Sequence, residues 1–162
     1  MPTPPAFERK LLAQADFARA VAELPRPRVF TNGVFDLLHR GHVTYLAQAR
    51  ALGASLVVGV NADASVRRLG KGADRPINAC ADRMAVLAAL EVVDRVVAFD
   101  EDTPLALILA MRPEVLVKGG DWPVDRIVGA DAVRGWGGSV HAIAFEHQRS
   151  TTTMLARIRG AG

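Results

Sequence analysis

Residues 30–46, FTNGVFDLLHRGHVTYL, contain the pattern that decides the fold. A strand-like apolar run stops at Gly33, and a helix-like pattern begins beside two histidines, His39 and His42, with Gly41 between them. A strand that turns into a helix through a short glycine-containing segment is typical of the crossover units of parallel sheets. The stretch therefore predicts an α/β fold with polar side chains where a strand ends.

Short β-branched runs alternate with helical patterns along the rest of the chain, as in a parallel sheet with crossover helices. Strands are predicted at residues 29–32, 56–60, 95–98, 115–118 and 140–144. A leading helix is predicted at residues 7–24, and further helices at residues 43–52, at 79–93 with Asn78 as the cap, at 104–111, and after a cap at Ser150.

These elements predict one doubly wound, Rossmann-like α/β domain over residues 1–162. Within it we expect a leading helical segment at residues 1–27 and a core at residues 28–160. The core should hold a five-stranded parallel sheet in the order 3-2-1-4-5.

The composition argues against several classes of protein. The 162 residues carry 20 Lys plus Arg and 17 Asp plus Glu with the signs interspersed, which predicts no nucleic-acid partner. No apolar run approaches the roughly 20 residues that cross a bilayer, and no signal peptide begins the sequence, so we expect a cytoplasmic protein without a membrane partner. Cys80 is the only cysteine, which excludes an internal disulfide and a cysteine-based zinc site.

Ligands of doubly wound sheets bind beyond the carboxyl ends of the strands, where the strand order reverses. Four predicted loops meet at that rim, namely those after Asn32, Asn61, Lys118 and Ala144. Two of the three lysines in the chain, Lys71 and Lys118, lie in or beside these loops. We therefore expect the functional site at this rim.

The two histidines suit an anion. At the start of a helix the backbone N–H groups and the positive end of the helix dipole favour phosphate. His39 and His42 are three residues apart and can project to the same side, where both rings can donate hydrogen bonds to phosphate oxygens. A zinc site is disfavoured because the other histidines, His141 and His147, lie on another segment and no cysteine assists them.

Two further motifs face the same rim. In RSTT, residues 149–152, Ser150 or Thr151 can cap the last helix while hydroxyl and N–H groups face an anion. In KGGDW, residues 118–122, the glycines open the backbone, Lys118 offers a charge to phosphate, and Asp121 can accept sugar hydroxyls or support a hydrated metal ion. Each motif alone has a plain alternative, an ordinary helix cap and a solvated turn.

The string TNGVFDLLHRGH resembles the signature of the nucleotidyltransferase superfamily that includes the cytidylyltransferases and pantetheine-phosphate adenylyltransferase. A narrower resemblance comes from GVNADASVRRL, EDTPL, RPEVLVKGGDW, VGAD and RSTT, whose order and spacing look like those of the heptose-1-phosphate adenylyltransferases. This resemblance extends from about Val29 to Arg159 and includes nearly all of the chain.

The resemblance implies transfer of AMP from ATP to D-glycero-β-D-manno-heptose 1-phosphate, which gives ADP-heptose and pyrophosphate for the inner core of lipopolysaccharide. It also implies Mg²⁺ held mainly by phosphate oxygens and water, a homo-oligomer such as a dimer, and a separate heptose kinase, since the family enzyme is often fused to a sugar kinase.

The same resemblance assigns roles to individual residues. The catalytic residues are His39, His42, Lys118 and Thr151. The nucleotide-binding residues are Asn32, Gly33, Val34, Phe35, Asp36, Gly41, Gly120, Asp121, Arg149, Ser150 and Thr152. The substrate-binding residues are Lys71, Arg83 and Asn61, and no residue is assigned as a metal ligand. Asp36 is expected to orient the histidine loop.

Two alternatives stay open at this point. One is a cytidylyltransferase or another sugar-phosphate nucleotidyltransferase, although residues 91–94, EVVD, replace the arginine-bearing motif of the glycerol-phosphate cytidylyltransferases. The other is a regulatory module that binds a nucleotide without turnover, which would not need the complete set of phosphate-binding residues.

Overall fold

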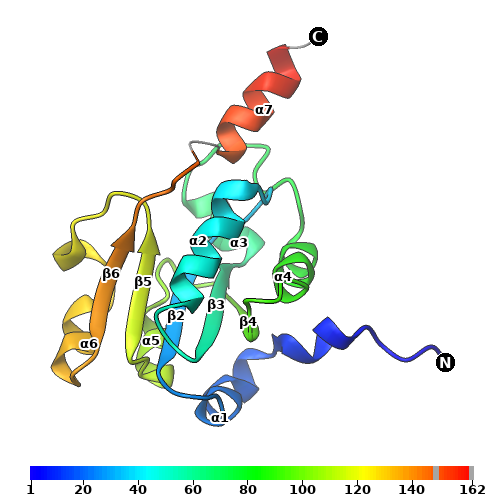
Figure 1. The fold of residues 1–162 in the computed structure, drawn as a ribbon. Helices are drawn as coiled ribbons and strands as arrows, with labels where there is room; N and C mark the ends of the chain where they lie inside the picture. Colours follow the sequence, from blue (N-terminus) through cyan, green and yellow to red (C-terminus); the bar gives the residue numbers. More distant parts are fainter. Residues whose placement is uncertain (148–149, 161–162) are drawn as a thin grey trace.

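A computed structural model of the protein describes residues 1–147 and 150–160. A parallel sheet lies at its centre (Figure 1). Its six strands are β1 (Leu11–Leu12), β2 (Arg28–Gly33), β3 (Ser55–Asn61), β4 (Arg95–Phe99), β5 (Val115–Gly119) and β6 (Ser139–Ile143). They lie side by side in the order β1-β4-β3-β2-β5-β6, which places β2 between β3 and β5.

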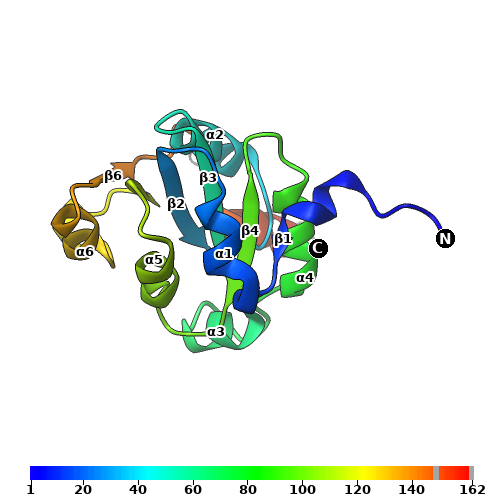
Figure 2. The same cartoon turned by 90° about the horizontal axis from the view of Figure 1, so that it is seen from below.

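Helices cover both faces of this sheet. The helices are α1 (Phe17–Ala22), α2 (Arg40–Arg50), α3 (Asp63–Arg68), α4 (Cys80–Ala88), α5 (Leu105–Met111), α6 (Ala130–Gly135) and α7 (Thr151–Gly160), with short 3₁₀ helices η1 (Ala6–Lys10), η2 (Gln14–Asp16) and η3 (Val124–Arg126). One face packs against α1, α5 and α6, and the other against α2 and α4. Figure 2 shows α2 and α5 on opposite sides of the sheet, and in Figure 1 α7 projects from the end to which the strands point.

The central strands are buried on both faces. Val29 and Phe30 of β2 are both fully buried, with Val29 in one core cluster and Phe30 in the other. They pair in register with Val115 and Leu116 of β5, which divide between the two clusters in the same way. Strands covered by helices on both faces have continuous apolar sequences, so these strands could be predicted from the sequence.

The five-strand prediction is wrong because a sixth strand, β1, pairs with β4 at the edge of the sheet. The predicted leading helix at residues 7–24 is wrong for the same reason. Phe7 and Leu11 pack on the α2 side of the sheet, whereas Phe17 and Val21 pack on the α1 side. One straight helix cannot deliver apolar side chains to both faces, so the segment breaks at β1 and crosses the edge.

The helix boundaries contain a second correction. Asn78 does not cap α4, whose N-cap is Ala79 without a side-chain hydrogen bond. Instead, Asn78 bonds to Asp36 through both its backbone N–H and its side-chain amide. The cap predicted at Ser150 is confirmed, because its hydroxyl accepts a hydrogen bond from Thr153 N at 3.0 Å.

Helices α3 and α6 have only six residues each and were not predicted, because such short segments have no clear apolar period.

In the described ranges no helix has both the length and the apolar character needed to span a membrane.

Candidate functional site

A cleft of about 350 Å³ opens where β2 and β5 end. Its lining combines the end of β2, the histidine segment, the loop after α3, the end of β5 and the start of α7. The lining residues are Asn32, Gly33, Val34, Phe35, Asp36, His39, His42, Tyr45, Lys71, Arg75, Lys118, Gly119, Trp122, Phe145, Ser150, Thr151 and Thr152. All four catalytic residues predicted from the sequence therefore meet in one cleft.

The two histidines lie face to face at the start of α2, with ring centroids 3.9 Å apart and an angle of 28° between the rings. His39 is the N-cap residue, and its Nδ1 accepts a hydrogen bond from Gly41 N at 3.1 Å. Since Nδ1 is an acceptor, a neutral His39 ring carries its proton on Nε2. That tautomer gives the ring a second nitrogen that can donate to an anion.

The His42 ring is held in its neutral form. Burial, followed by the nearby charges of His39 and Lys71, lowers the pKa of His42 to about 4. Its Nδ1 is buried and has no hydrogen-bond partner among the described residues. Unsatisfied buried polar atoms are rare in folded proteins, and a site for a polar ligand is one place where they occur.

Gly33 and Gly41 are small for reasons that the sequence did not reveal. A Cβ atom on Gly33 would lie 2.9 Å from the Phe35 ring, and one on Gly41 would lie 2.9 Å from the His39 ring. Both glycines therefore make room for neighbouring side chains. Gly33 lines the cleft as predicted, but Gly41 does not; it allows His39 to fold back over the helix start.

The cleft carries uncompensated positive charge. Neither Lys71 nor Lys118 has a carboxylate within 4 Å among the described residues, and the Lys118 ammonium lies 5.7 Å from the centre of the Trp122 ring. Burial and then the charge of Lys71 lower the pKa of Lys118, and burial and then the charge of Arg75 lower that of Lys71. A ligand with several negative charges would relieve this repulsion.

The start of α7 adjoins the histidine segment at the cleft. Thr151 is buried, and its hydroxyl donates to the carbonyl oxygen of Leu37 at 3.3 Å, which attaches α7 to the histidine segment. Ser150 and Thr152 line the cleft beside it. The residues at the starts of both α2 and α7 line the same cleft. Because the first N–H groups of a helix have no partner within the helix, a helix start favours an anion.

A smaller compartment of about 180 Å³ adjoins the cleft toward the ends of β3 and β4. It shares Lys71 and Lys118 with the cleft and adds Asn61, Asp102 and Thr103. The two lysines therefore stand at the junction of two compartments, where one bound group can meet another.

Asp36 anchors the segment that carries Lys71. Its buried carboxylate accepts hydrogen bonds from Arg75 Nε at 2.7 Å and from the backbone N–H groups of Ile77 and Asn78. Burial by itself would raise the pKa of Asp36, but the hydrogen bonds from Asn78, Ile77 and Arg75 lower it overall. Asp36 lines the cleft, yet its oxygens are used to connect two loops.

Arg83 lies beneath the cleft and not in it. Its side chain is fully buried and donates to the carbonyl oxygens of Val34, Asn61 and Asn78 and to the Asp63 carboxylate. The expectation that Arg83 contacts a substrate is therefore not met by this geometry. The guanidinium instead connects the ends of β2 and β3 to the start of α4.

Three other predicted residues are not placed in the cleft, and three residues near it were not predicted. Gly120 and Asp121 do not line the cleft or its smaller compartment. Arg149 lies outside the described residues. Sequence reasoning did not assign Arg75, Tyr45 or Phe145 to the site. Tyr45 resembles an ordinary core position on a helix, and only the tertiary structure brings its ring against Phe145, with centroids 5.5 Å apart.

The chain is similar in sequence to known proteins over most of its length. The cytidylyltransferase-like family profile matches residues 30–155. The chain is 59% identical over 155 residues to the D-beta-D-heptose 1-phosphate adenylyltransferase of Bordetella bronchiseptica, covering 94% of this chain and 96% of the relative. It is 56% identical over 156 residues to the bifunctional protein HldE of Pseudomonas paraeruginosa, where it spans only 32% of the relative.

Solved structures show the same fold. A lipopolysaccharide core biosynthesis protein from Thermoplasma volcanium is 31% identical, with a TM-score of 0.62 over 75% of this chain and 98% of that one. The pantoate-beta-alanine ligase of Francisella tularensis is 13% identical with a TM-score of 0.58 over 88% of this chain and 68% of that one, which shows similarity of fold alone.

The position of Arg83 gives a first prediction. Arg83→Leu would leave Asp63 and buried carbonyl oxygens without a donor, so we expect a loss of about 3–5 kcal/mol in the free energy of unfolding, measured with urea. The control, Arg67→Leu, removes an exposed arginine of α3 and should stay within about 0.5 kcal/mol. If Arg83→Leu had normal stability but bound substrate weakly, Arg83 would be a substrate-binding residue, as the sequence predicted.

The low pKa of His42 gives a second prediction. Between pH 6.5 and about pH 4 the unfolded chain binds a proton at His42 and the folded chain does not, so this residue lowers stability as the pH falls through that window. His42→Gln should therefore lose less stability than the wild type between pH 7 and about pH 5 in urea unfolding. His141→Gln, outside the cleft, should follow the wild type. Parallel curves for wild type and His42→Gln would contradict the buried neutral ring.

Proposed function

Because this chain belongs to the cytidylyltransferase-like family, and within it to the heptose 1-phosphate adenylyltransferases, we propose that it transfers AMP from ATP to D-glycero-β-D-manno-heptose 1-phosphate. The products are ADP-heptose and pyrophosphate. The observation that carries the proposal is the meeting of His39, His42, Lys71 and Lys118 with the start of α7 around one positively charged cleft.

The reaction needs positioning and charge stabilisation more than proton transfer. An oxygen of the sugar phosphate attacks the α-phosphorus of ATP, a new P–O bond forms, and the bond to the bridging oxygen of pyrophosphate breaks. The attacking phosphate is already an anion at neutral pH, so no general base is required. Negative charge on the α-phosphoryl oxygens and the leaving group must be stabilised instead.

The histidines and lysines are placed to supply that stabilisation. The stacked rings of His39 and His42 offer N–H donors, and the neutral state of His42 suits a hydrogen bond that strengthens as charge develops. Lys118 adds a full positive charge. We assign the β- and γ-phosphates to Ser150, Thr151 and Thr152 at the start of α7, where a helix favours anions.

We assign the heptose to the smaller compartment. The lysines at its junction with the cleft can hold the 1-phosphate close to the α-phosphorus, since both compartments share Lys71 and Lys118. Asn61, Asp102 and Thr103 offer polar groups to sugar hydroxyls. This arrangement would place the acceptor and the nucleotide on either side of the lysines.

We propose that Mg²⁺ enters the site bound to ATP. No cluster of three His, Cys, Asp or Glu side chains that could hold a metal occurs among the residues the structure describes, and Asp36 already binds Arg75. We therefore propose that phosphate oxygens and water supply the ligands of Mg²⁺, which neutralises part of the triphosphate charge. The residues of the chain would position the complex.

We also propose the place of this reaction in a sequence of reactions. Its substrate is a sugar 1-phosphate, so a kinase-type reaction must supply it, and a reaction that transfers heptose must consume ADP-heptose. Lipopolysaccharide core assembly agrees with the similarity to the lipopolysaccharide core biosynthesis protein of Thermoplasma volcanium. Association into a dimer stays a prediction.

The third prediction tests the choice of substrates. The protein is incubated with ATP or CTP together with heptose 1-phosphate or glycerol 3-phosphate, and pyrophosphate release is measured. We expect release with ATP and heptose 1-phosphate. Release only with CTP would show a cytidylyltransferase, and ATP binding without release from any pair would favour a non-catalytic nucleotide-binding module.

The fourth prediction concerns His42. His42→Ala should lower kcat by about 10²–10³-fold, the usual effect of removing one donor to the transition state. His141→Ala is the matched control, because His141 lies on β6 outside the cleft, and it should keep normal turnover. Turnover of His42→Ala at the wild-type rate would remove this histidine from the mechanism.

A further inference from the structure

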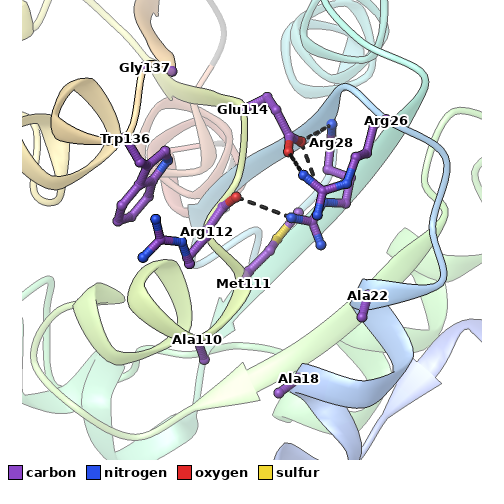
Figure 3. A pocket seen from close by; sticks show the side chains of 11 residues that line it. Ala18, Ala22, Arg26, Arg28, Ala110, Met111, Arg112, Glu114, Trp136 and Gly137 are labelled. Atoms are coloured by element: carbon purple, nitrogen blue, oxygen red, sulfur yellow. Dashed lines mark hydrogen bonds and ion pairs between the residues drawn. The ribbon is translucent and has the colours of Figure 1, made fainter.

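A second pocket lies at the end of the sheet where the strands begin, opposite the catalytic cleft (Figure 3). Its volume is about 360 Å³, close to that of the cleft. It is formed by α1, the end of α5, the segment that enters β2 and the turn after α6. Nothing in the proposed reaction uses this pocket.

The pocket gathers more positive than negative charge. Three arginines line it, Arg26, Arg28 and Arg112, together with a single carboxylate, Glu114. In Figure 3, Arg112 and Trp136 lie on one side of the pocket, and Arg26, Arg28 and Glu114 lie on the other. Arg26 and Arg28 share this carboxylate, so the pocket holds an excess of positive charge.

Arg28 and Glu114 form a fixed part of the wall. Arg28 is buried, and its guanidinium donates to Glu114 and to the carbonyl oxygens of Val21 and Arg112. Burial by itself would raise the pKa of Glu114, but hydrogen bonds from the Arg28 backbone and side chain lower it overall. Glu114 is therefore ionised, and it pairs with both the buried Arg28 and the exposed Arg26.

Arg112 is placed differently. Its guanidinium has no carboxylate partner in residues 1–147 or 150–160, and it stands 4.8 Å from the centre of the Trp136 ring. Its backbone is left-handed, with φ of 50°, at the residue that follows α5. Glycine is usual at that position, and another residue there costs about 1 kcal/mol. Despite this cost, an arginine occupies the position, and its guanidinium can contact a ligand in the pocket.

The remaining wall is apolar and made of small side chains. Ala18 and Ala22 of α1 face Ala110 and Met111 at the end of α5. In Figure 3 the three alanines lie below the arginines. The pocket therefore offers charge at its sides and an uncharged surface between them.

We propose that this pocket binds a small organic phosphate, with the phosphate between Arg112 and Arg26 and the body of the molecule on the alanine surface. A phosphate monoester carries about −1.5 to −2 charges at neutral pH, which matches the excess of the three guanidinium groups over the single carboxylate in the lining. Arginine also presents paired N–H donors that fit phosphate oxygens. A volume of about 360 Å³ exceeds what the phosphate alone needs and lies within the range of small-molecule pockets.

Trp136 gives a direct measurement of binding. The chain has two tryptophans, Trp122 in the catalytic cleft and Trp136 in this pocket. In Trp122→Phe the tryptophan fluorescence therefore comes from Trp136 alone. We use glucose 6-phosphate as the probe and expect a saturable change in fluorescence with half-saturation at about 1 mM or below. Glucose without phosphate should cause no change.

Two variants in the Trp122→Phe background test the assignment. Arg112→Gly removes the guanidinium and suits the left-handed backbone, so it should fold normally. Arg26→Gln leaves Arg112 over Trp136. Each should raise the half-saturation concentration by at least about tenfold. Arg19→Gln removes the same charge from an exposed position of α1 and should not change binding.

Three results would overturn the proposal. The first is a linear, non-saturating response of Trp136 to glucose 6-phosphate. The second is unchanged half-saturation in both Arg112→Gly and Arg26→Gln, or an equal loss in Arg19→Gln, which would indicate a general effect of charge. The third is equal half-saturation for inorganic phosphate, which would contradict a role for the alanine surface in holding an organic group.

Discussion

The candidate cleft depends on the buried carboxylate of Asp36. The residue follows the end of β2, and its two oxygens bind Arg75 and the backbone N–H groups of Ile77 and Asn78. A carboxylate that accepts several N–H bonds is held in its ionised form. This interaction fixes the histidine segment against the segment that carries Lys71, so groups far apart in the chain keep a constant spacing. Beneath the cleft, Arg83 connects the ends of β2 and β3 by donating to the backbone carbonyl oxygens of Val34 and Asn61.

Arginine and lysine have different tasks in this protein. Arg28 and Arg83 are buried and each donates several hydrogen bonds, and the buried Arg75 donates to Asp36. A planar guanidinium with five N–H donors is suited to such fixed contacts. Lys71 and Lys118 stand at the cleft without an ion-pair partner among the described residues. A compact ammonium on a flexible stem can follow a phosphate that moves during transfer. The scarcity of lysine in the sequence thus has a structural counterpart.

Without a bound anion, the groups that line the cleft lower the stability of the folded protein. Burial and then nearby positive charges lower the pKa values of His42, Lys71 and Lys118, which means that the folded chain disfavours their charged forms. Binding a polyphosphate removes this penalty, since an opposite charge favours the charged form of each lysine. In the proposed reaction the groups that weaken the free protein would therefore contribute to substrate binding, and neighbouring anchors such as Asp36 stabilise the arrangement.

The sequence by itself determined the α/β class, the central strands and the gathering of His39, His42, Lys118 and Thr151 at one rim, because apolar runs and strand-end motifs are local properties. It did not determine β1, since a two-residue strand is defined only by its partner β4. It also could not separate Lys71, which lines the cleft, from Arg83, which is buried beneath it. Which charged side chain faces a ligand and which one supports the backbone depends on packing between distant segments. Only the tertiary structure decided that.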